Sequence, residues 1–474
     1  MRDANSQMSF ADLAFTSQGI ELDPVLKQIL GFVQQNSAMV EAVRKQLNHG
    51  LKKPQTGRRG LNAQQTLLSL ILMRYKNWDY RELRERIADG YTLRQFTQFY
   101  SGPVPKHNAF HRAHNRLTPE TMKLVNEALV QAAVSAGLES GDALRTDTTV
   151  VETDIHHPTD ATLLWDTVRV LHRLLHHLRE LVPHQMPRFP KRTRAAKRRM
   201  LELQRMTATE RECKQVPTYR KLIGITEETL ANARRALEAT KNSCGKSTAD
   251  LLEIEALRKQ MTDLCPLGDR VVNQARRRVI NGEEVPAAEK IYSIFEPHTS
   301  LIKRGKAGKP IEFGHKVFIA ESRHGLITQY QVLDGNRSDQ DHVQPSLQRH
   351  KATFGSAPKL LANDRGFYSD ANIKIAEQEG VACVCIPQRG GKKTPEREAF
   401  EKSREFKQGQ RFRAGVEGTL SVLFRGRGMK RCLAEGITRF ELLVGAAVFA
   451  NNLMRIAALL LQKTKRKKAQ PRAA

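Results

Sequence analysis

Apolar positions in the first third of the chain recur at helical spacing. Within residues 62–75 an apolar side chain returns every third or fourth position, which predicts a buried helix. At residues 118–121, Thr-Pro-Glu-Thr combines a capping threonine with proline at the first helical position, so we expect another helix from there to about residue 136. These patterns predict a compact helical domain over residues 55–137, preceded by a partly helical segment over residues 1–54.

The pattern then alternates between strands and helices. Residues 144–153 are β-branched and apolar, which predicts a buried strand, whereas residues 166–290 are helical in pattern and rich in Lys and Arg. Four further strands are expected at residues 315–321, 326–333, 359–362 and 381–386, and two helices at about 341–354 and 370–379. We therefore interpret residues 166–290 as a basic helical insertion between the first strand and the others.

Without the insertion, this order of strands and helices is that of an RNase H-like fold. We expect an α/β catalytic domain with a mixed five-stranded sheet and helices, formed by residues 138–165 and 291–462, and joined to the N-terminal all-α domain. Residues 446–461 predict a last apolar helix. Residues 463–474 are strongly basic and are expected to form a disordered tail.

The charge of the chain indicates the kind of partner. Its 78 Lys and Arg exceed its 50 Asp and Glu, giving a formal net charge of +28, which favours DNA or RNA. An anionic membrane is the alternative, but we find no long uninterrupted apolar run and no signal-peptide core, so we expect a cytoplasmic protein without membrane contact. The cysteines form no Cys-x-x-Cys pair and are expected to be reduced thiols, with Cys383 and Cys385 on one face of a strand.

Three acidic residues stand where a two-metal enzyme needs them. Asp147 lies in the first predicted strand, Asp364 follows the strand at residues 359–362, and Glu417 lies in a helical segment. An ionised carboxylate beside an apolar strand is costly unless a cation or a donor satisfies it. If the fold brings the three together, they can hold two Mg²⁺ or Mn²⁺ ions with positions open for phosphate and water. We therefore predict that all three are catalytic and metal-binding.

Each acid also has a structural alternative. Asp147 and Asp364 could cap strands or pair with arginines. Glu417 shares a helix face with Arg413, so a plain ion pair between residues four positions apart would explain it. Glu435 is a rival for the third position, but it lies beyond a glycine-rich break in the helical pattern.

Four motifs carry a resemblance to a known family: RTDTTVVET at 145–153 with HPTD at 157–160, NDRGFY at 363–368, Arg-x-x-x-Glu at 413–417, and AAVFANNL at 446–453. With them the chain resembles bacterial insertion-sequence transposases of the DDE type, in the branch that includes the ISNCY group, over about residues 61–461. The resemblance implies metal-dependent cleavage at transposon ends and strand transfer into target DNA, without ATP. It also implies a homo-oligomer, expected to be a dimer on DNA, in the bacterial cytoplasm and associated with the nucleoid when bound.

The chain departs from a related signature of this superfamily, which has Tyr before the Arg and Lys at a later position. Phe412 and Phe424 stand at these two places, and Arg425 and Lys430 could supply the phosphate contact instead. The residues that we expect to contact DNA are Lys303, Arg304, Lys306, Lys309, Arg365, Arg413, Arg425 and Lys430.

Double-stranded DNA is the expected partner, both as terminal inverted repeats and as target. The helical domain at residues 55–137 is expected to bind the repeats, with a packing or dimer role as the alternative. The insertion is expected to contact flanking DNA or a second protomer. Two other functions remain open: a metal-dependent nuclease without strand transfer, and a catalytically silent DNA-binding protein derived from a transposase.

Two weaker motifs are set aside. Residues 243–248 resemble a phosphate-binding loop but lack its first glycine. His172, His176 and His177 have the spacing of metal ligands on a helix, yet no further ligand is evident, and a basic helix face touching DNA is the simpler interpretation.

Overall fold

The computed structural model describes residues 9–17, 21–53, 56, 60–242, 247–303 and 310–469. The chain divides into two compact units. Unit 1 comprises Met1–Glu152 and His315–Ala474, and unit 2 comprises Thr153–Gly314. The predicted helical insertion at residues 166–290 therefore belongs to a longer unit.

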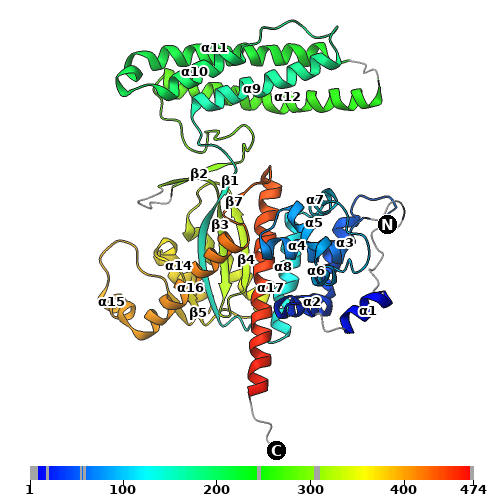
Figure 1. Ribbon diagram of the computed structural model, residues 1–474. Helices are drawn as coiled ribbons and strands as arrows, with labels where there is room; N and C mark the ends of the chain where they lie inside the picture. The colour runs from blue at the N-terminus through cyan, green and yellow to red at the C-terminus, as the bar shows by residue number, and fades with distance from the viewer. Residues whose placement is uncertain are drawn as a thin grey trace, which may run out of the picture. The chain divides into compact units, whose positions relative to one another are not determined.

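Eight helices of the described part of unit 1 precede its sheet (Figure 1). They are α1 (Phe10–Ser17), α2 (Pro24–Gln35), α3 (Ser37–Asn48), α4 (Ala63–Lys76), α5 (Tyr80–Asp89), α6 (Tyr91–Phe96), α7 (His107–His114) and α8 (Pro119–Ser135). Helix α4 starts with a capping box, in which Asn62 and Gln65 each accept the other's backbone N–H. The predicted cap of α8 is confirmed, because the Thr118 hydroxyl accepts the N–H of Thr121 at 3.2 Å.

The predicted division at residue 54 does not separate two cores. Ile29 of α2, Met39 of α3 and Leu67 of α4 are buried in one cluster with Phe449 of the last helix, α17 (Ile437–Ala469). Helix α17 runs along α2, α4 and α8 (Figure 1). The N-terminal helices therefore form one body with the C-terminal helix, a pairing between chain ends that no local pattern announces.

The fold class is α/β with a mixed sheet, as predicted, but with seven strands in the described residues rather than five. The strands are β1 (Ala143–Thr153), β2 (Ser300–Lys303), β3 (Ile311–Ser322), β4 (Ile327–Leu333), β5 (Leu360–Ala362), β6 (Cys383–Cys385) and β7 (Arg431–Cys432). Their order is β2-β3-β1-β5-β6, with β4 also paired to β3 and β7 to β1. Strands β1, β5 and β6 are parallel, whereas β3 is antiparallel to β2 and β4. The short strands β2 and β7 gave too little pattern to be predicted.

The remaining helices of unit 1 follow β4. They are η2 (Asp339–His342), α13 (Val343–Phe354), η3 (Arg365–Phe367), α14 (Asp370–Gln378), α15 (Pro395–Lys402) and α16 (Arg404–Gly426). Helices α13 and α14 confirm the two predicted helices. Helix α16 packs on β5 and β6, where Phe406 is buried with Cys385. The sulfurs of Cys383 and Cys385 lie 3.5 Å apart, which confirms that the two thiols share a face.

Helix α17 corrects one expectation. It continues to Ala469, so residues 463–469 of the predicted disordered tail are helical, and residues 470–474 lie outside the described residues. By length and composition its span Ile437–Arg466 is apolar enough to cross a membrane, although Asn451, Asn452 and Arg455 interrupt the apolar run. Because 67% of its most apolar window is buried inside the protein, the apolar side chains are those of a core helix, consistent with a soluble protein.

Unit 2 is an elongated helical bundle (Figure 1). Its helices are α9 (Asp160–Leu181), α10 (Thr193–Arg205), α11 (Ala208–Ala239), α12 (Thr248–Ala275) and the π-helical turn η1 (Arg276–Ile280). Leu175, Leu222 and Met261, from three of these helices, are fully buried in its core. The unit is therefore helical and basic as predicted, with its own hydrophobic core.

Candidate active site

Three elements of unit 1 bring the predicted acids to one guanidinium. Asp147 lies in β1, Asp364 directly after β5, and Glu417 in α16. Nη2 of Arg413 lies 3.5 Å from Oδ2 of Asp147 and 3.8 Å from Oδ2 of Asp364, and its Nη1 lies 3.1 Å from Oε1 of Glu417. Acids far apart in sequence thus converge on a single side chain.

The structural alternatives are present at the same place. The ion pair between Arg413 and Glu417 exists, and Asp364 also accepts the N–H of Gly366 at 2.7 Å, as a cap of η3 does. Glu435 lies exposed between β7 and α17, and within the described chain it forms no ion pair with Arg413. Arg413 therefore gathers Glu417, and not its rival, with the two aspartates.

Asp147 is the most buried of the three acids, with 12% of its side chain exposed. Burial raises the pKa of Asp147 to about 6, although Arg413 and the N–H of Thr148, which donates to it at 2.7 Å, favour the charged form. The neighbouring carboxylates of Asp364 and Asp339 raise this pKa further. Asp147 is therefore a carboxylate that a second cation would stabilise.

Asp339, in η2, is a fourth acid at this site and was not predicted. Its Oδ1 accepts from the Thr148 hydroxyl at 2.9 Å and pairs with Nζ of Lys316 at 2.6 Å. A Cβ added at Gly366 would lie 2.9 Å from Oδ2 of Asp339 and 3.0 Å from Oδ1 of Asp364, so both acids flank this glycine. Asp339 is the first residue of the short helix η2, after β4, and only the folded sheet brings it to Asp147.

A buried ion pair holds α16 against the sheet. Arg145, two residues before Asp147, donates to both carboxylate oxygens of Glu321 on β3, at 2.7 and 3.0 Å. It also donates to the backbone carbonyl of Phe412, and the Thr419 hydroxyl donates to Glu321 at 2.9 Å. Because Phe412 and Thr419 lie on either side of Glu417 in α16, this network fixes the helix that carries the third acid.

Two glycines allow α16 to approach this closely. A Cβ added at Gly415 would lie 2.2 Å from Nη1 of Arg145, and one added at Gly409 would lie 2.4 Å from the Cys385 sulfur. Such distances are far below van der Waals contact, so a side chain at either position requires its neighbour to move. Sequence reasoning missed Arg145, Glu321 and both glycines. Glycine inside a helix was the available signal, but it is not a selective one, because Gly418 in the same helix has open space around it.

The predicted DNA-contacting residues are placed as follows. Arg365, Arg425 and Lys430 are exposed, whereas Arg413 is 20% exposed and turned to the carboxylates. Lys303 ends β2 in unit 2 and is exposed. Arg304, Lys306 and Lys309 lie outside the described residues. The structure therefore joins Arg413, alone of the described residues in this set, to the three acids by ion pairs.

The donor atoms fit a hard divalent cation. Mg²⁺ and Mn²⁺ prefer carboxylate oxygens, which Asp147, Asp364 and Glu417 supply. Across the described residues, however, no group of three or more His, Cys, Asp or Glu side chains is close enough to hold a metal ion. The guanidinium of Arg413 is the cation between these carboxylates, so binding of a metal there requires Arg413 to withdraw.

Arg413 has one unsatisfied donor, which bears on that withdrawal. Its Nε is buried and has no hydrogen-bond partner among the residues described. A buried donor without a partner costs about 1–3 kcal/mol, so the observed position of the guanidinium is less favourable than its three ion pairs suggest. A position in which Nε also has a hydrogen-bond partner would therefore be more favourable for the Arg413 side chain.

Comparison of the chain with protein-family models, with curated proteins and with solved structures gave no match.

Proposed function

We propose that the chain is a DDE-type transposase, which cuts DNA at transposon ends and joins the freed end to target DNA. The observation that carries this proposal is the convergence of Asp147, Asp364 and Glu417 on Arg413. The strand order β4-β3-β1-β5-β6, with β1, β5 and β6 parallel, supports an RNase H-like core. In such a core the first strand, the fourth strand and a later helix carry the acids. When the short strand β2 is left out, β1, β5 and α16 hold these three places in the chain.

Asp147, Asp364 and Glu417 would hold two Mg²⁺ or Mn²⁺ ions. When bound, such ions activate water and stabilise a leaving oxygen. Asp147 would have to give up its proton to take part, which its pKa of about 6 makes easy near neutral pH. Arg413, once released from the carboxylates, would be free to pair with a DNA phosphate beside them.

The reaction would proceed by two exchanges at phosphorus. Water would attack the scissile phosphodiester, the bond to the 3′ oxygen would break, and a 3′-hydroxyl would be freed. That hydroxyl would then lose its proton and attack a phosphodiester of target DNA, whose own 3′ oxygen would leave and take up a proton. Since one phosphodiester replaces another in the second step, no ATP is required. Within the chain, the carboxylates and Arg413 would position and neutralise the reacting phosphate.

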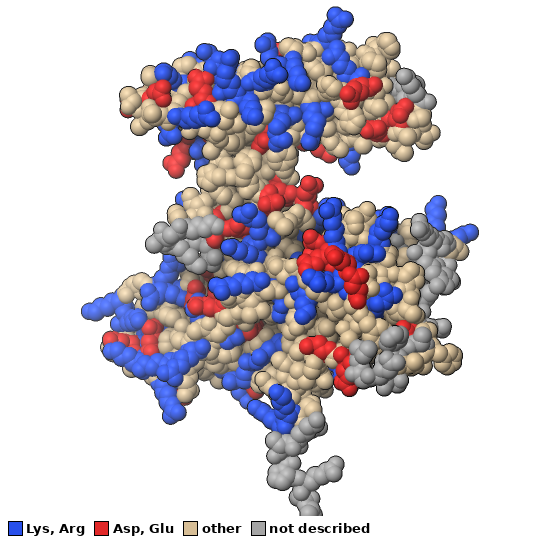
Figure 2. Space-filling view, viewed as in Figure 1, with Lys and Arg blue, Asp and Glu red and all other residues tan. Residues whose placement is uncertain are grey.

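Charge supports double-stranded DNA as the partner. The net charge is +28, and Lys and Arg are numerous on the face seen in Figure 2. Lys303, Arg304, Lys306, Lys309, Arg365, Arg425 and Lys430 are proposed phosphate contacts. Since each such contact releases counterions, affinity should fall steeply as salt rises. Affinity that is independent of salt would contradict this assignment. Assembly as a dimer on paired ends and action at the bacterial nucleoid belong to the same proposal.

The test is movement in cells of a marker flanked by the DNA that borders this gene. The natural chain is compared with Glu417→Gln and with the matched control Glu435→Gln. Glu417 is 67% exposed, so its substitution should spare the fold. We expect movement with the natural chain and the control, and a loss of at least about a thousandfold with Glu417→Gln, since the residue would act on the transition state.

Two results would identify another function. Metal-dependent cleavage in vitro that leaves only free ends would show a nuclease. DNA binding with no cleavage, at equal strength in the natural chain and in Asp364→Asn, would show a silent DNA-binding protein. Equal movement with Glu417→Gln would refute the assignment of the third acid.

A further inference from the structure

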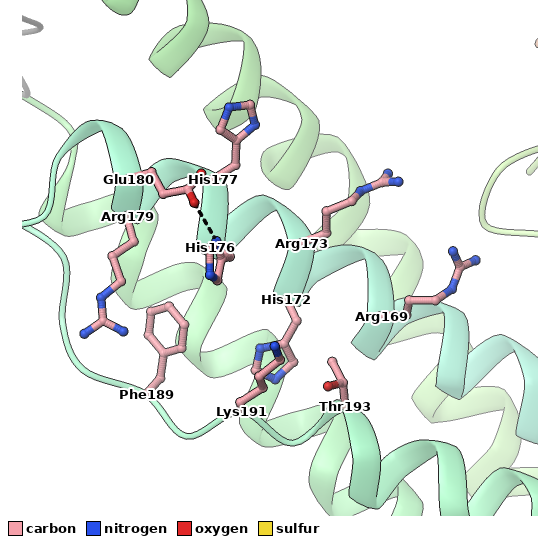
Figure 3. A pocket seen from close by; sticks show the side chains of 10 residues that line it. All are labelled: Arg169, His172, Arg173, His176, His177, Arg179, Glu180, Phe189, Lys191 and Thr193. Atoms are coloured by element: carbon pink, nitrogen blue, oxygen red, sulfur yellow. Dashed lines mark ion pairs between the residues drawn. The ribbon is translucent and has the colours of Figure 1, made fainter.

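Unit 2 contains a cavity of about 630 Å³, lined by residues of α9 and of the segment that leads to α10 (Figure 3). Four cations line it, Arg169, Arg173, Arg179 and Lys191, against one carboxylate, Glu180. Its volume lies within the range of pockets that hold small organic ligands. The cavity is therefore large enough for more than a single inorganic anion.

Most of the positive charge of this cavity is not neutralised. Glu180 pairs with His176 at 3.3 Å, and Arg169 pairs with Asp166 at 2.7 Å. In the described part of the chain, Arg173, Arg179 and Lys191 have no carboxylate partner. Cations without a carboxylate partner favour an anion with several oxygens, such as a phosphate.

Aromatic rings form another part of the wall. Phe189 lies beside Arg179, whose guanidinium is 5.6 Å from the centroid of the Phe189 ring (Figure 3). The centroids of the Phe189 and His172 rings are 6.3 Å apart. The backbone N–H of Arg192 donates to Nε2 of His172 at 3.3 Å, which fixes that ring. Burial, together with the charge of Lys191, lowers the pKa of His172, which favours the neutral form of the ring. A flat ring on a ligand could thus stack on Phe189 while its anionic part reaches the cations.

We propose that this cavity binds a nucleotide of an unpaired DNA strand, with its phosphates on Arg173, Arg179 and Lys191 and its base on Phe189. Recognition of single strands combines cations that follow the backbone with aromatic rings that stack on bases, and both are present here. A duplex, whose bases are already stacked, offers only its phosphates to such a hollow. The inference goes beyond the proposed function, because it needs none of the carboxylates of unit 1.

The test is binding of a fluorescent ten-residue oligothymidylate to the full chain without metal, measured by anisotropy at fixed salt. Arg173→Ala with Arg179→Ala is compared with Arg220→Ala with Lys221→Ala, which removes two exposed cations of α11 outside the cavity. We expect the first pair to weaken binding by at least about tenfold and the second by less than about threefold. Equal losses would overturn the proposal, because charge anywhere on unit 2 would then suffice.

The contact with the base is tested separately. Phe189→Leu keeps an apolar side chain against the core of unit 2 but removes the ring. We expect it to weaken oligothymidylate binding by at least about fivefold and to leave an abasic oligomer of equal length unaffected. Equal effects on both oligomers would overturn the stacking part of the proposal. Should Phe189→Leu unfold, Lys191→Ala tests the phosphate part in its place.

A free nucleotide offers the same chemistry as a nucleotide in a strand. Thymidine monophosphate is therefore added as a competitor of the labelled oligomer. Competition that the cavity variants abolish would support a nucleotide site that needs no strand. If thymidine monophosphate does not compete, and Arg173→Ala with Arg179→Ala still weakens oligomer binding about tenfold, the site requires a strand. Marker movement tests the transposase assignment, whereas anisotropy without metal tests the cavity, so a failure of one assignment is distinguishable from a failure of the other.

Discussion

In unit 1 two arginines of the candidate active site, Arg145 and Arg413, pair with carboxylates, whereas in unit 2 two arginines that line the cavity, Arg173 and Arg179, have no carboxylate partner among the described residues. Arg145 is 11% exposed and forms a bidentate ion pair with Glu321, and Arg413 forms ion pairs with three acids. Arg173 of unit 2 is exposed and lacks a carboxylate partner within the described residues. Arginine therefore has two roles in this chain. Enclosed and paired, arginine fixes a structure, while exposed and unpaired it is available to a ligand.

The strongest challenge to this contrast is removal of one enclosed arginine. Arg145→Ala leaves the fully buried carboxylate of Glu321 without its main partner, so we expect a loss of about 3–5 kcal/mol in the free energy of unfolding. Urea unfolding measures it. The control is Arg86→Ala, which breaks an exposed pair with Glu82 and should cost less than about 1 kcal/mol. Similar losses in the two variants would end the distinction between enclosed and exposed arginines.

The buried carboxylate of Asp147 should lower the free energy of unfolding at neutral pH. The pKa of Asp147 in the folded chain is about 6, above the 3.8 of an ordinary aspartate, so folding favours its protonated form and stability falls as pH rises from about 4 to 6. Asp147→Asn removes this cost. We expect unfolding at pH 7.5 to become up to about 3 kcal/mol less favourable, and no gain at pH 3.5.

The exposed acid provides the control for that experiment. Glu417→Gln should change the unfolding free energy by less than about 0.5 kcal/mol at either pH, because most of its side chain is in solvent. A gain for Asp147→Asn that is equal at both pH values would show that packing, rather than charge, is responsible.

The next largest change in stability is expected where α16 packs closely on Arg145. Gly415→Ala would place a methyl group against the guanidinium of Arg145, and we expect a loss of about 1–2 kcal/mol. Gly418→Ala, in the same helix with open space around it, should instead stabilise by about 0.5–1 kcal/mol. Thermal unfolding of the two variants compares them, and opposite signs are the expected result. A loss from both would mean that α16 tolerates no alanine for some other reason.

The smallest effect belongs to unit 2. Arg173→Ala should change the unfolding free energy by no more than about 0.5 kcal/mol, since the side chain is exposed and no partner is lost among the described residues. A matched surface change, Arg220→Ala, should behave alike in urea unfolding. A loss above about 1 kcal/mol for Arg173→Ala alone would place this arginine with the structural arginines of unit 1.

Local patterns predicted what neighbouring residues determine. The strand around Asp147, the cap at Thr118 and the helices α13 and α14 were predicted because β-branched runs, capping residues and helical periodicity act within about ten residues. Asp147, Asp364 and Glu417 were likewise identifiable from their motifs, and the structure gathers them around Arg413. Their catalytic role remains a prediction.

Contacts between distant segments were not predictable in this way. Arg145 and Glu321 lie 176 residues apart, and Thr148 and Asp339 lie 191 apart, so neither pair leaves a periodic signal. The shared core of α2, α3 and α17 joins the two ends of the chain for the same reason. The short strands β2 and β7 owe their extended form to the strands beside them rather than to their own residues.

The hydrogen bond from Arg145 to Phe412 spans 267 residues. At about 5–20 residues per second, a ribosome needs on the order of tens of seconds to make that stretch, and until it is complete Arg145 cannot be joined to α16. A chain that stops early, or is cut within unit 2 before it folds, therefore never assembles the acids around Arg413. We expect the site to mature only after α16 has been made, which would keep chains that stop before Glu417 from acting on DNA.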